Sequence, residues 1–405
     1  MTEARTSVRV ALRSVVPGAA MIAVTFGLAR YGYGLLLPEM QADLGIDPRA
    51  VGLIASGAYV SYLAGNTAVV WLIGRFGPRP PIALAAISAA VGMVAIASAD
   101  GPGTLALGVV VAGAAGGLAF PPYADVVARE VPAAHRAVSW SAISSGTGWG
   151  VAMAGPVAIA FGSSWRVAWL VFAGLAVVIG IIATRAAPAR RAGGGGLQPP
   201  RLSWSWLVCP RSRPLLLSAV LVGAGSSVWW AFSVDALRAA GLGETEARIA
   251  YAVCGVAGIA ASATGVLTNR IGLRRGYLVG CVALVVAIML PGVAASQLAA
   301  ALVGMALFGV AYNGVVAGQG LWNATVFGER PSAGLAAVNT ALTLGMIGGP
   351  SVAGLVIHSY GYPAAFLGAA AAVAAGAFFA PPRPADESGS ARAAIVCKQP
   401  CHCHP

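Results

Sequence analysis

The chain has 405 residues, of which 58% are hydrophobic and only 9% are charged, and its mean hydropathy is +0.80. So much apolar surface cannot be buried in a water-soluble core, so the composition excludes a soluble globular protein and predicts an integral membrane protein. The formal net charge of +12 would suggest nucleic-acid binding in a soluble protein, but here the cations fall between apolar segments, and we expect no nucleic-acid partner.

Apolar segments long enough to cross a bilayer, about 20 residues each, follow one another along the chain. We expect an all-α protein with twelve transmembrane helices in the lipid bilayer. The first segment is too long for a signal peptide and is interpreted as a retained helix. The predicted spans are 14–38, 51–74, 80–98, 103–127, 137–161, 166–184, 214–239, 248–268, 276–296, 298–324, 333–357 and 362–381.

Basic residues are distributed unevenly between the two sides that these spans define. Of the 25 lysines and arginines, 20 fall at the chain ends and in every second gap. The opposite gaps and their margins hold Arg49, Arg166, Arg238 and Arg248. Because cytoplasmic loops carry the excess of basic residues, we expect a multi-pass protein of the cytoplasmic membrane with both termini in the cytoplasm.

The longest gap, 185–213, has six arginines, no acidic residue and a run of four glycines, which is typical of a flexible cytoplasmic linker. It separates six predicted helices from six. We therefore expect an N-terminal six-helix bundle over 1–184, a C-terminal six-helix bundle over 214–381, and a disordered cytoplasmic tail over 382–405.

Two sequence patterns each occur twice, and the distance along the chain between the two copies is nearly the same for both. Arg75, Gly77 and Arg79 follow the second span, and Arg270, Gly272 and Arg274 follow the eighth, 195 positions later. The stretch "GWGVAMAGP" ends at Pro156, and "GMIGGP" ends at Pro350, 194 positions later. Two matches near half the chain length indicate a tandem duplication, so the bundles should be pseudo-symmetric copies related by an axis along the membrane normal.

The loop "GVLTNRIGLRR", Gly265 to Arg275, resembles the loop motif of major facilitator superfamily transporters, and "GMIGGPSVAG" resembles a helix-packing pattern of that superfamily. The first copy of the loop has Gly74 where the family usually has an acid. The segments "ARYGYGLLLPEMQADLG", "LAFPPYADVVAR" and "SGTGWGVAMAGP" are similar to its YbfB/YjiJ-type bacterial branch. The resemblance implies a gating loop, comprising Arg75, Gly77, Arg79, Asn269, Arg270, Gly272, Arg274 and Arg275, and packing positions at Gly155, Pro156, Gly345, Gly349 and Pro350.

In this family, helices 1, 4, 7 and 10 line a central cavity, which draws attention to Arg30 in the first span. At about 1.5 Å per residue, Arg30 lies about 22 Å into an apolar core of about 30 Å. Helical side chains lean towards the N-terminus, which opposes snorkelling to the outer surface. Phe26 and Tyr33 lie on the same face of the predicted helix as Arg30. Gly27 and Gly34 leave room beside that side chain. We expect Arg30 to face a cavity or a partner.

Two interpretations of Arg30 stay open. It binds substrate or takes part in coupling, or it pairs structurally with a carboxylate or with backbone carbonyl groups. Asp125 and Asp235 are the carboxylates inside the predicted spans, and Asp235 is the nearer in depth. Asp235 could equally be an interfacial acid beside Arg238.

Further cavity candidates come from helices 4, 7 and 10, although packing explains most membrane aromatics equally well. The amides of Asn313 and Gln319 are stronger candidates than the aromatic residues, because a buried amide needs hydrogen-bond partners. These candidates are Phe120, Tyr123, Trp229, Trp230, Tyr312, Asn313, Gln319, Trp322 and Asn323. The predicted substrate-binding set is Arg30, Tyr33, Phe26, Tyr123, Trp230, Asp235, Asn313 and Gln319.

Enzyme chemistry finds no support, because the sequence has no nucleophile and base constellation, phosphate loop or dinucleotide fingerprint. We expect no cofactor. Proton coupling is implied by the resemblance alone, since no acid falls at mid-membrane. The tail clusters Cys397, Cys401, His402, Cys403 and His404. These side chains could bind a metal, but their spacing matches no established zinc site, and we predict no metal centre.

The sequence therefore predicts a monomeric secondary transporter that moves a small organic solute, with Arg30 attracting an anionic group. A multidrug or natural-product exporter is one alternative. A membrane sensor that kept the fold but lost transport is another, from a different functional class.

Overall fold

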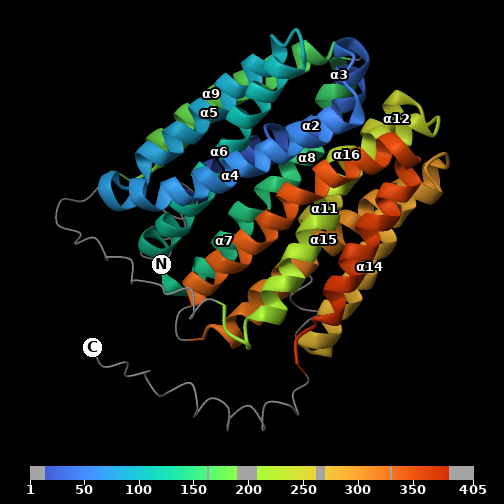
Figure 1. Ribbon diagram of the computed structural model, residues 1–405. Coiled ribbons are helices and arrows are strands. Elements are labelled where there is room, and N and C mark those ends of the chain that lie inside the picture. Colours follow the sequence, from blue (N-terminus) through green and yellow to red (C-terminus); the bar gives the residue numbers. More distant parts are fainter. Residues whose placement is uncertain (1–13, 162–163, 189–207, 261–269, 329–330, 383–405) are drawn as a thin grey trace, which may run out of the picture.

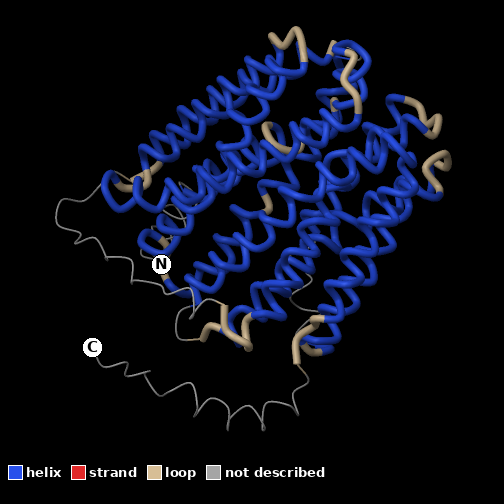
Figure 2. The backbone as a smooth tube through the Cα atoms, viewed as in Figure 1, coloured by secondary structure: helices blue, strands red, loops and turns tan. Residues whose placement is uncertain are grey.

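Helices make up all the regular structure in the described part of the chain. The computed structural model describes residues 14–161, 164–188, 208–260, 270–328 and 331–382. The helices lie side by side, and most of the loops that join them gather at the two ends of the molecule (Figure 2). A bilayer imposes this arrangement, because a helix satisfies its backbone polar groups internally.

The first half of the chain forms one group of helices, coloured blue to green in Figure 1. It begins with an interrupted segment, in which the helix over Ser14–Leu28 ends in a π-helical turn and is followed by two short helices. The elements of this half are η1 (Ala23–Leu28), α2 (Gly32–Leu35), α3 (Leu37–Leu44), α4 (Pro48–Phe76), α5 (Arg79–Ala97), α6 (Pro102–Glu130), η2 (Ala133–His135), α7 (Arg136–Ser144), α8 (Gly146–Phe161) and α9 (Trp165–Ala186).

The second half forms the other group, coloured yellow-green to red in Figure 1. Its elements are α11 (Arg213–Ala239), α12 (Glu244–Ala260), α14 (Leu273–Val293), α15 (Leu298–Val326) and α16 (Pro331–Phe378). The halves meet chiefly where α4 packs against α16 and where α8 packs against α12. Both contacts join helices that are far apart in the sequence.

These helices confirm the all-α membrane fold, but they are not twelve uninterrupted spans. Eight of the described helices are long and apolar enough to cross a membrane by themselves. One of them, α16, covers the last two predicted spans and turns at Gly361, whose φ is +81°. The first predicted span breaks at 29–31 and the fifth divides at Ser145. The eighth is described only as far as Ala260.

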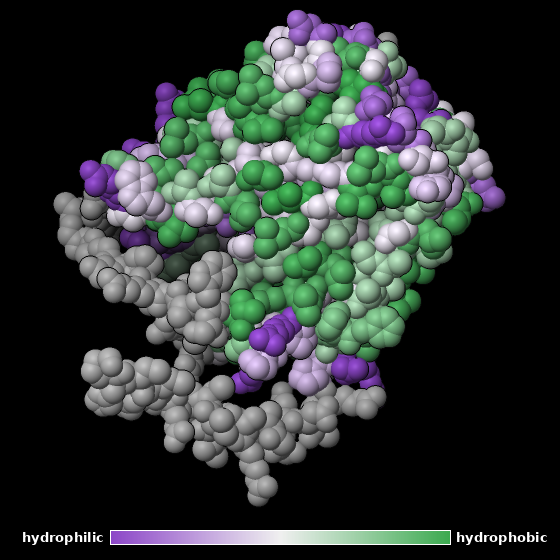
Figure 3. Space-filling model, in the orientation of Figure 1, coloured by the Kyte–Doolittle hydropathy of each residue, from purple (hydrophilic) through white to green (hydrophobic). Residues whose placement is uncertain are grey.

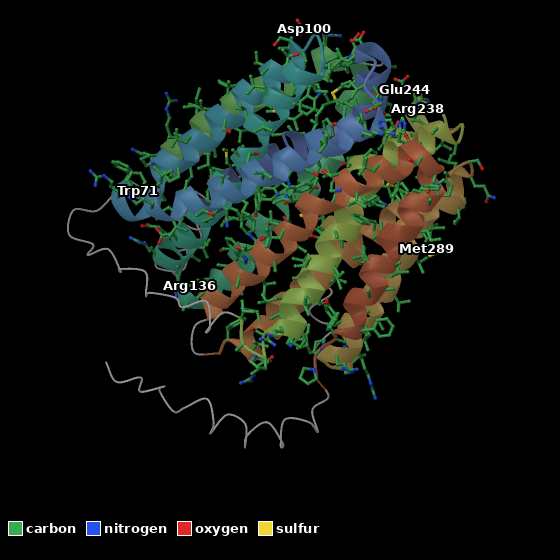
Figure 4. All side chains as sticks on the ribbon, in the orientation of Figure 1. Trp71, Asp100, Arg136, Arg238, Glu244 and Met289 are labelled. Atoms are coloured by element: carbon green, nitrogen blue, oxygen red, sulfur yellow. The ribbon has the colours of Figure 1, made fainter. Side chains whose placement is uncertain are left out.

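The two ends of the bundle can be identified by the residues labelled in Figure 4. Trp71 and Arg136 lie at one end, and Asp100, Arg238 and Glu244 lie at the other. We call these the Arg136 end and the Glu244 end. The side of the bundle seen in Figure 3 is largely apolar between hydrophilic ends. Its apolar side chains would face lipid, as expected for a membrane protein.

The repeated loop sequence has the same structure in both halves. Gly77 ends α4 with a φ of +81°, and Gly272 precedes α14 with a φ of +84°, a region that residues with a Cβ rarely adopt. Two positions beyond each glycine, an arginine binds backbone carbonyl groups at the end of a neighbouring helix. Arg79 donates to the Thr184 carbonyl at 3.0 Å, and Arg274 donates to the carbonyl of Pro381. Helix termini leave such carbonyl groups unpaired, so Arg79 caps α9, whereas Arg274 binds the chain just beyond the end of α16.

Three other arginines of the predicted gating loop lie at the surface of the molecule. Arg75 lies over the rings of Trp71 and Phe76, at 5.9 and 5.5 Å from their centroids. Arg270 and Arg275 are exposed. Asn269 lies outside the described residues, as do the linker over 189–207 and the cysteine and histidine cluster of the tail.

Small residues hold the first helix of each half close to its fifth. A Cβ atom at Gly345 would overlap the Val220 carbonyl of α11, and one at Gly349 would overlap the Ala224 carbonyl. In the first half, Gly150 of α8 meets the carbonyl of Ala23 in the same way. Such close approach lets helices pack tightly without a hydrophobic driving force. Gly345 and Gly349 therefore lie at a close helix–helix contact.

Candidate functional site

Arg30 lies at a break in the first transmembrane segment. The π-helical bonds of η1 continue into the break, where the Ala29 amide donates to Val24 at 2.8 Å and the Tyr31 amide donates to Phe26 at 3.0 Å. Wide turns of this kind are frequent at functional sites, and broken helices line binding sites in many transporters. The cation of the first span is thus carried on irregular backbone between η1 and α2.

Aromatic rings surround the Arg30 guanidinium. The side chain is buried, with 9% of the residue exposed, and its carbon Cζ lies 4.2 Å from the ring centroid of Tyr62 and 4.6 Å from that of Tyr59. The rings of Phe26 and Tyr31 complete the enclosure at 5.4 and 5.6 Å. The faces of these rings carry partial negative charge, so they stabilise the cation without neutralising it.

Hydrogen bonding of Arg30 is incomplete. One terminal nitrogen donates to the sulfur of Met346 at 3.5 Å, and Nε has no hydrogen-bond partner. Among the described residues, no carboxylate forms a salt bridge with Arg30. A buried charge without an ionic partner is costly, so this site has a strong electrostatic preference for an anion.

A small cavity opens beside Arg30, between the two halves of the molecule. Its walls come from the helix break, from α4 and α6 of the first half, and from Trp230 and Ala231 of α11. Tyr33 also lines it, and the Tyr33 hydroxyl donates to the Val51 carbonyl at 3.3 Å. The free volume is about 20 Å³, enough for a single water molecule. A solute can enter only if the halves move apart.

Further rings extend this site into the second half of the chain. Tyr31 stacks on Trp230 with ring centroids 3.8 Å apart, and Trp229 stacks on Phe308 at 3.5 Å. The ring of Tyr312 stacks on Phe308 in turn, with ring centroids 5.5 Å apart. We call Arg30, Tyr31, Tyr59, Tyr62 and Trp230 the Arg30 site. Tyr31, Tyr59 and Tyr62 were not among the predicted binding residues, although their type and spacing along the first two spans could have indicated them.

Asp235 is not the partner of Arg30. Its carboxylate accepts a hydrogen bond from the Tyr362 hydroxyl of α16. The terminal amide of Gln41 also lies against it, 2.9 Å from each carboxylate oxygen when the amide nitrogen faces Asp235. Asp235 therefore joins α11 to α3 and α16. Of the two open interpretations of Arg30, structural pairing with this carboxylate has no support in the structure.

Three other predicted binding residues are placed away from the Arg30 site. Tyr123 packs beside Gly18 and Ile143 in a separate apolar cluster of the first half. Gln319 donates to the Tyr277 hydroxyl at 3.2 Å, within the second half. Asn313 donates to the Gly309 carbonyl of its own helix. Each of these groups has a packing or hydrogen-bonding role where it lies.

An ion cluster joins the halves at the Glu244 end. Arg248 is buried, with 2% of its side chain exposed, and lies 3.0 Å from Glu39 of α3. It also pairs with Glu244, one turn earlier in α12, and donates to the Ala158 carbonyl of α8 at 3.0 Å. We call Glu39, Glu244 and Arg248 the Arg248 latch. Arg248 was counted among the cations at the margins of the spans, and nothing in the sequence indicated its pairing with Glu39.

Closer packing joins the halves beside this latch. The hydroxyl groups of Ser56 in α4 and Ser351 in α16 lie 2.7 Å apart. A Cβ atom at Gly52 would overlap the carbonyl of Pro350, so the predicted packing position Pro350 lies at the interface between the halves.

The two residues of the other predicted packing pair, Gly155 and Pro156, have different surroundings. A Cβ atom at Gly155 would lie 2.9 Å from the carbonyl of Arg248 and 2.7 Å from the Cβ of Ala252, which brings α8 against α12. Pro156 is exposed. Gly155 is thus a close contact between the halves.

Comparisons with known proteins agree with this geometry. The model of the Major Facilitator Superfamily matches residues 19–263 and 215–396. No curated protein matches the sequence. Solved structures are similar in fold at low identity, among them a mutant of the nucleoside transporter NupG, which is 16% identical with a TM-score of 0.74 and covers 90% of this chain and 98% of its own.

Two further solved structures show the same fold. The xylose transporter XylE from E. coli, in a partially occluded inward-open conformation, is 14% identical with a TM-score of 0.73, covering 91% of this chain and 96% of its own. A bacterial homologue of the human lysosomal transporter Spinster, inward-facing and occupied, is 14% identical with a TM-score of 0.71, covering 92% and 95%. The chain therefore belongs to the Major Facilitator Superfamily and is a multi-pass membrane transporter, not an enzyme.

Proposed function

We propose that this chain is a secondary transporter that moves a small organic solute across the cytoplasmic membrane by alternating access, and that Arg30 attracts an anionic or carboxylated group of that solute. The observation that carries the proposal is the Arg30 guanidinium, buried between the halves without a salt bridge to any described carboxylate. A carboxylate on the solute would supply the missing negative charge through short, charge-assisted hydrogen bonds.

The position of Arg30 supports a role in transport. Its cavity has walls from both halves, so a solute bound there contacts both bundles at once. A ligand shifts a conformational equilibrium only through different contacts in the two states. Because those contacts change when the bundles rock apart, a solute in the Arg30 site can bias the movement.

The Arg248 latch supplies the closed gate in this mechanism. The positive-inside distribution assigns the Glu244 end to the outside, so the conformation is closed outwards. The inward-facing states named for the XylE and Spinster-homologue structures accord with that assignment. To open outwards, the chain must separate Glu39 from Arg248 and Ser56 from Ser351.

One hydrogen bond connects the latch with the Arg30 site. Tyr251 follows Arg248 by one turn of α12, and its hydroxyl donates to the Tyr31 carbonyl at 2.8 Å. The carbonyl belongs to the residue after Arg30, within the helix break. A solute that displaces Tyr31 would therefore disturb α12, the helix that also carries Arg248.

Several finer features belong to the same proposal. We infer that both termini are cytoplasmic, that the chain divides at its basic linker, and that the transporter is a monomer. Proton coupling stays an expectation, for which Glu39 and Asp235 are candidate carboxylates because each contacts a residue of the other half. Export of an apolar natural product is the second candidate, favoured by the many aromatic rings around the cavity.

A ligand-stabilisation screen tests the proposal. The purified protein is heated with matched pairs of anionic and neutral solutes, because any ligand that binds only the folded state raises the melting temperature. We expect anions to dominate the stabilising solutes, and Arg30→Ala to remove their effect while Arg49→Ala, at an exposed arginine, keeps it. Stabilisation by neutral solutes alone would refute the anionic assignment. Solutes that bind but show no flux in proteoliposomes under any gradient would indicate a sensor.

A further inference from the structure

Buried hydrogen-bond donors in and beside the Arg30 site lack partners. Arg30 Nε and the indole nitrogens of Trp229 and Trp230 are buried without a partner. Nearly all buried polar groups in folded proteins are hydrogen-bonded, so unpaired donors need an explanation. Arg30 and Trp230 line the same cavity, one from each half of the chain. An occupant with two acceptor atoms would satisfy both donors at once.

The cavity wall also suits a flat ring. Tyr59 and Tyr62 lie against the guanidinium, and Tyr31 contacts both Arg30 and Trp230. A carboxylate that takes the guanidinium would free these ring faces for the rest of the ligand. Aromatic groups gain energy from stacked and edge-to-face contacts beyond the burial of their area.

We propose that the Arg30 site binds an aromatic carboxylate. One carboxylate oxygen accepts from Arg30, the other accepts from the Trp230 indole N–H, and the ring lies among Tyr31, Tyr59 and Tyr62. The inference rests on the proposed function, because it names the class of solute that Arg30 attracts. The present cavity has room for only one water molecule, so the ligand enters when α4 and α11 move apart.

Binding of benzoate to the purified wild-type protein tests this class, with cyclohexanecarboxylate as the matched acid and benzyl alcohol as the matched neutral ring. The two acids share charge and ring size, and only one is planar and aromatic. We expect benzoate to bind about two- to tenfold more tightly than cyclohexanecarboxylate, and benzyl alcohol to show no binding. Equal affinity for the two acids would overturn the aromatic assignment.

Two variants test whether the Trp230 indole N–H is the second donor to the carboxylate. Trp230→Phe keeps a ring and removes the N–H, and we expect it to weaken benzoate binding about tenfold. Trp149→Phe, at a tryptophan that is 52% exposed, should leave it unchanged. An unchanged affinity in a folded Trp230→Phe protein would overturn the role of Trp230.

The same titrations separate this inference from the proposed function. If both acids bind equally and Arg30→Ala abolishes both, the anionic site stands and the aromatic class fails. If neither acid nor any other anion of the stabilisation screen binds, both fail. The comparison of ligands on the wild-type protein needs no variant to fold.

Discussion

Replacing Glu39 by glutamine should open the gate at the Glu244 end. Glu39 is the member of the Arg248 latch that comes from the first half, and its carboxylate lies 3.0 Å from the buried Arg248. Glutamine keeps the size of the side chain and removes its charge. The latch would then hold only the pair formed within α12, which does not join the halves.

The size of the effect on the closed state depends on the interactions that Arg248 retains in the variant. Removing one partner of a buried ion pair costs about 3–5 kcal/mol when the other charge is left alone. Arg248 still has Glu244 and the Ala158 carbonyl, so we expect about 1–2 kcal/mol. Because the lost interaction exists only when the gate is closed, the ratio of open to closed molecules should rise about 5- to 30-fold.

Cysteine labelling measures this ratio. A single cysteine at Ser56, which is buried at the gate, is placed in a background from which the native cysteines are removed. In right-side-out vesicles, a membrane-impermeant thiol reagent should label it about 5- to 30-fold faster when Glu39→Gln is added. Glu246→Gln is the matched control, because Glu246 accepts a hydrogen bond from the Gly243 amide of its own half. Equal labelling with and without Glu39→Gln would refute the latch.

Two further predictions concern the interface and the packing. The hydroxyl groups of Ser56 and Ser351 lie 2.7 Å apart. Cysteines at both positions should therefore form a disulfide that blocks transport until it is reduced. Flux that persists with complete cross-linking would contradict the role of this contact in the gate. Gly345→Ala should destabilise the fold by about 1–3 kcal/mol because its Cβ meets a carbonyl of α11. Gly348→Ala, where a Cβ has open space, should not destabilise it, and equal melting temperatures for the two variants would contradict the packing.

The large-scale architecture was predictable because it depends on composition and repetition. Apolar segments of bilayer length, an excess of basic residues in alternate gaps and a repeat near half the chain length indicated a duplicated membrane protein. The resemblance of the loop and packing motifs then indicated the family. The repeat also predicted local structure, since Gly77 and Gly272 both adopt a positive φ, and Arg79 and Arg274 both bind backbone carbonyl groups at or just beyond the end of a neighbouring helix.

The details of the site depend on tertiary contacts that no local pattern encodes. Periodicity predicts a continuous first helix, whereas the structure breaks it next to Arg30, where a hydroxyl group from α12 reaches the Tyr31 carbonyl. Glu39 and Arg248 are distant in the sequence, and each resembled an ordinary interfacial charge. Tyr59 was overlooked because the family resemblance directs attention to helices 1, 4, 7 and 10, and this residue lies on the second.

The most direct test of the central claim is flux through Arg30 variants in proteoliposomes, with a radiolabelled anion that stabilises the wild-type protein as the probe. Arg30→Ala should abolish transport while the protein stays folded and monodisperse. Arg30→Lys should recover part of it, because an ammonium keeps the charge but loses the planar fork that binds a carboxylate with two hydrogen bonds. Wild-type flux in a folded Arg30→Ala protein would contradict the assignment of Arg30 to the substrate.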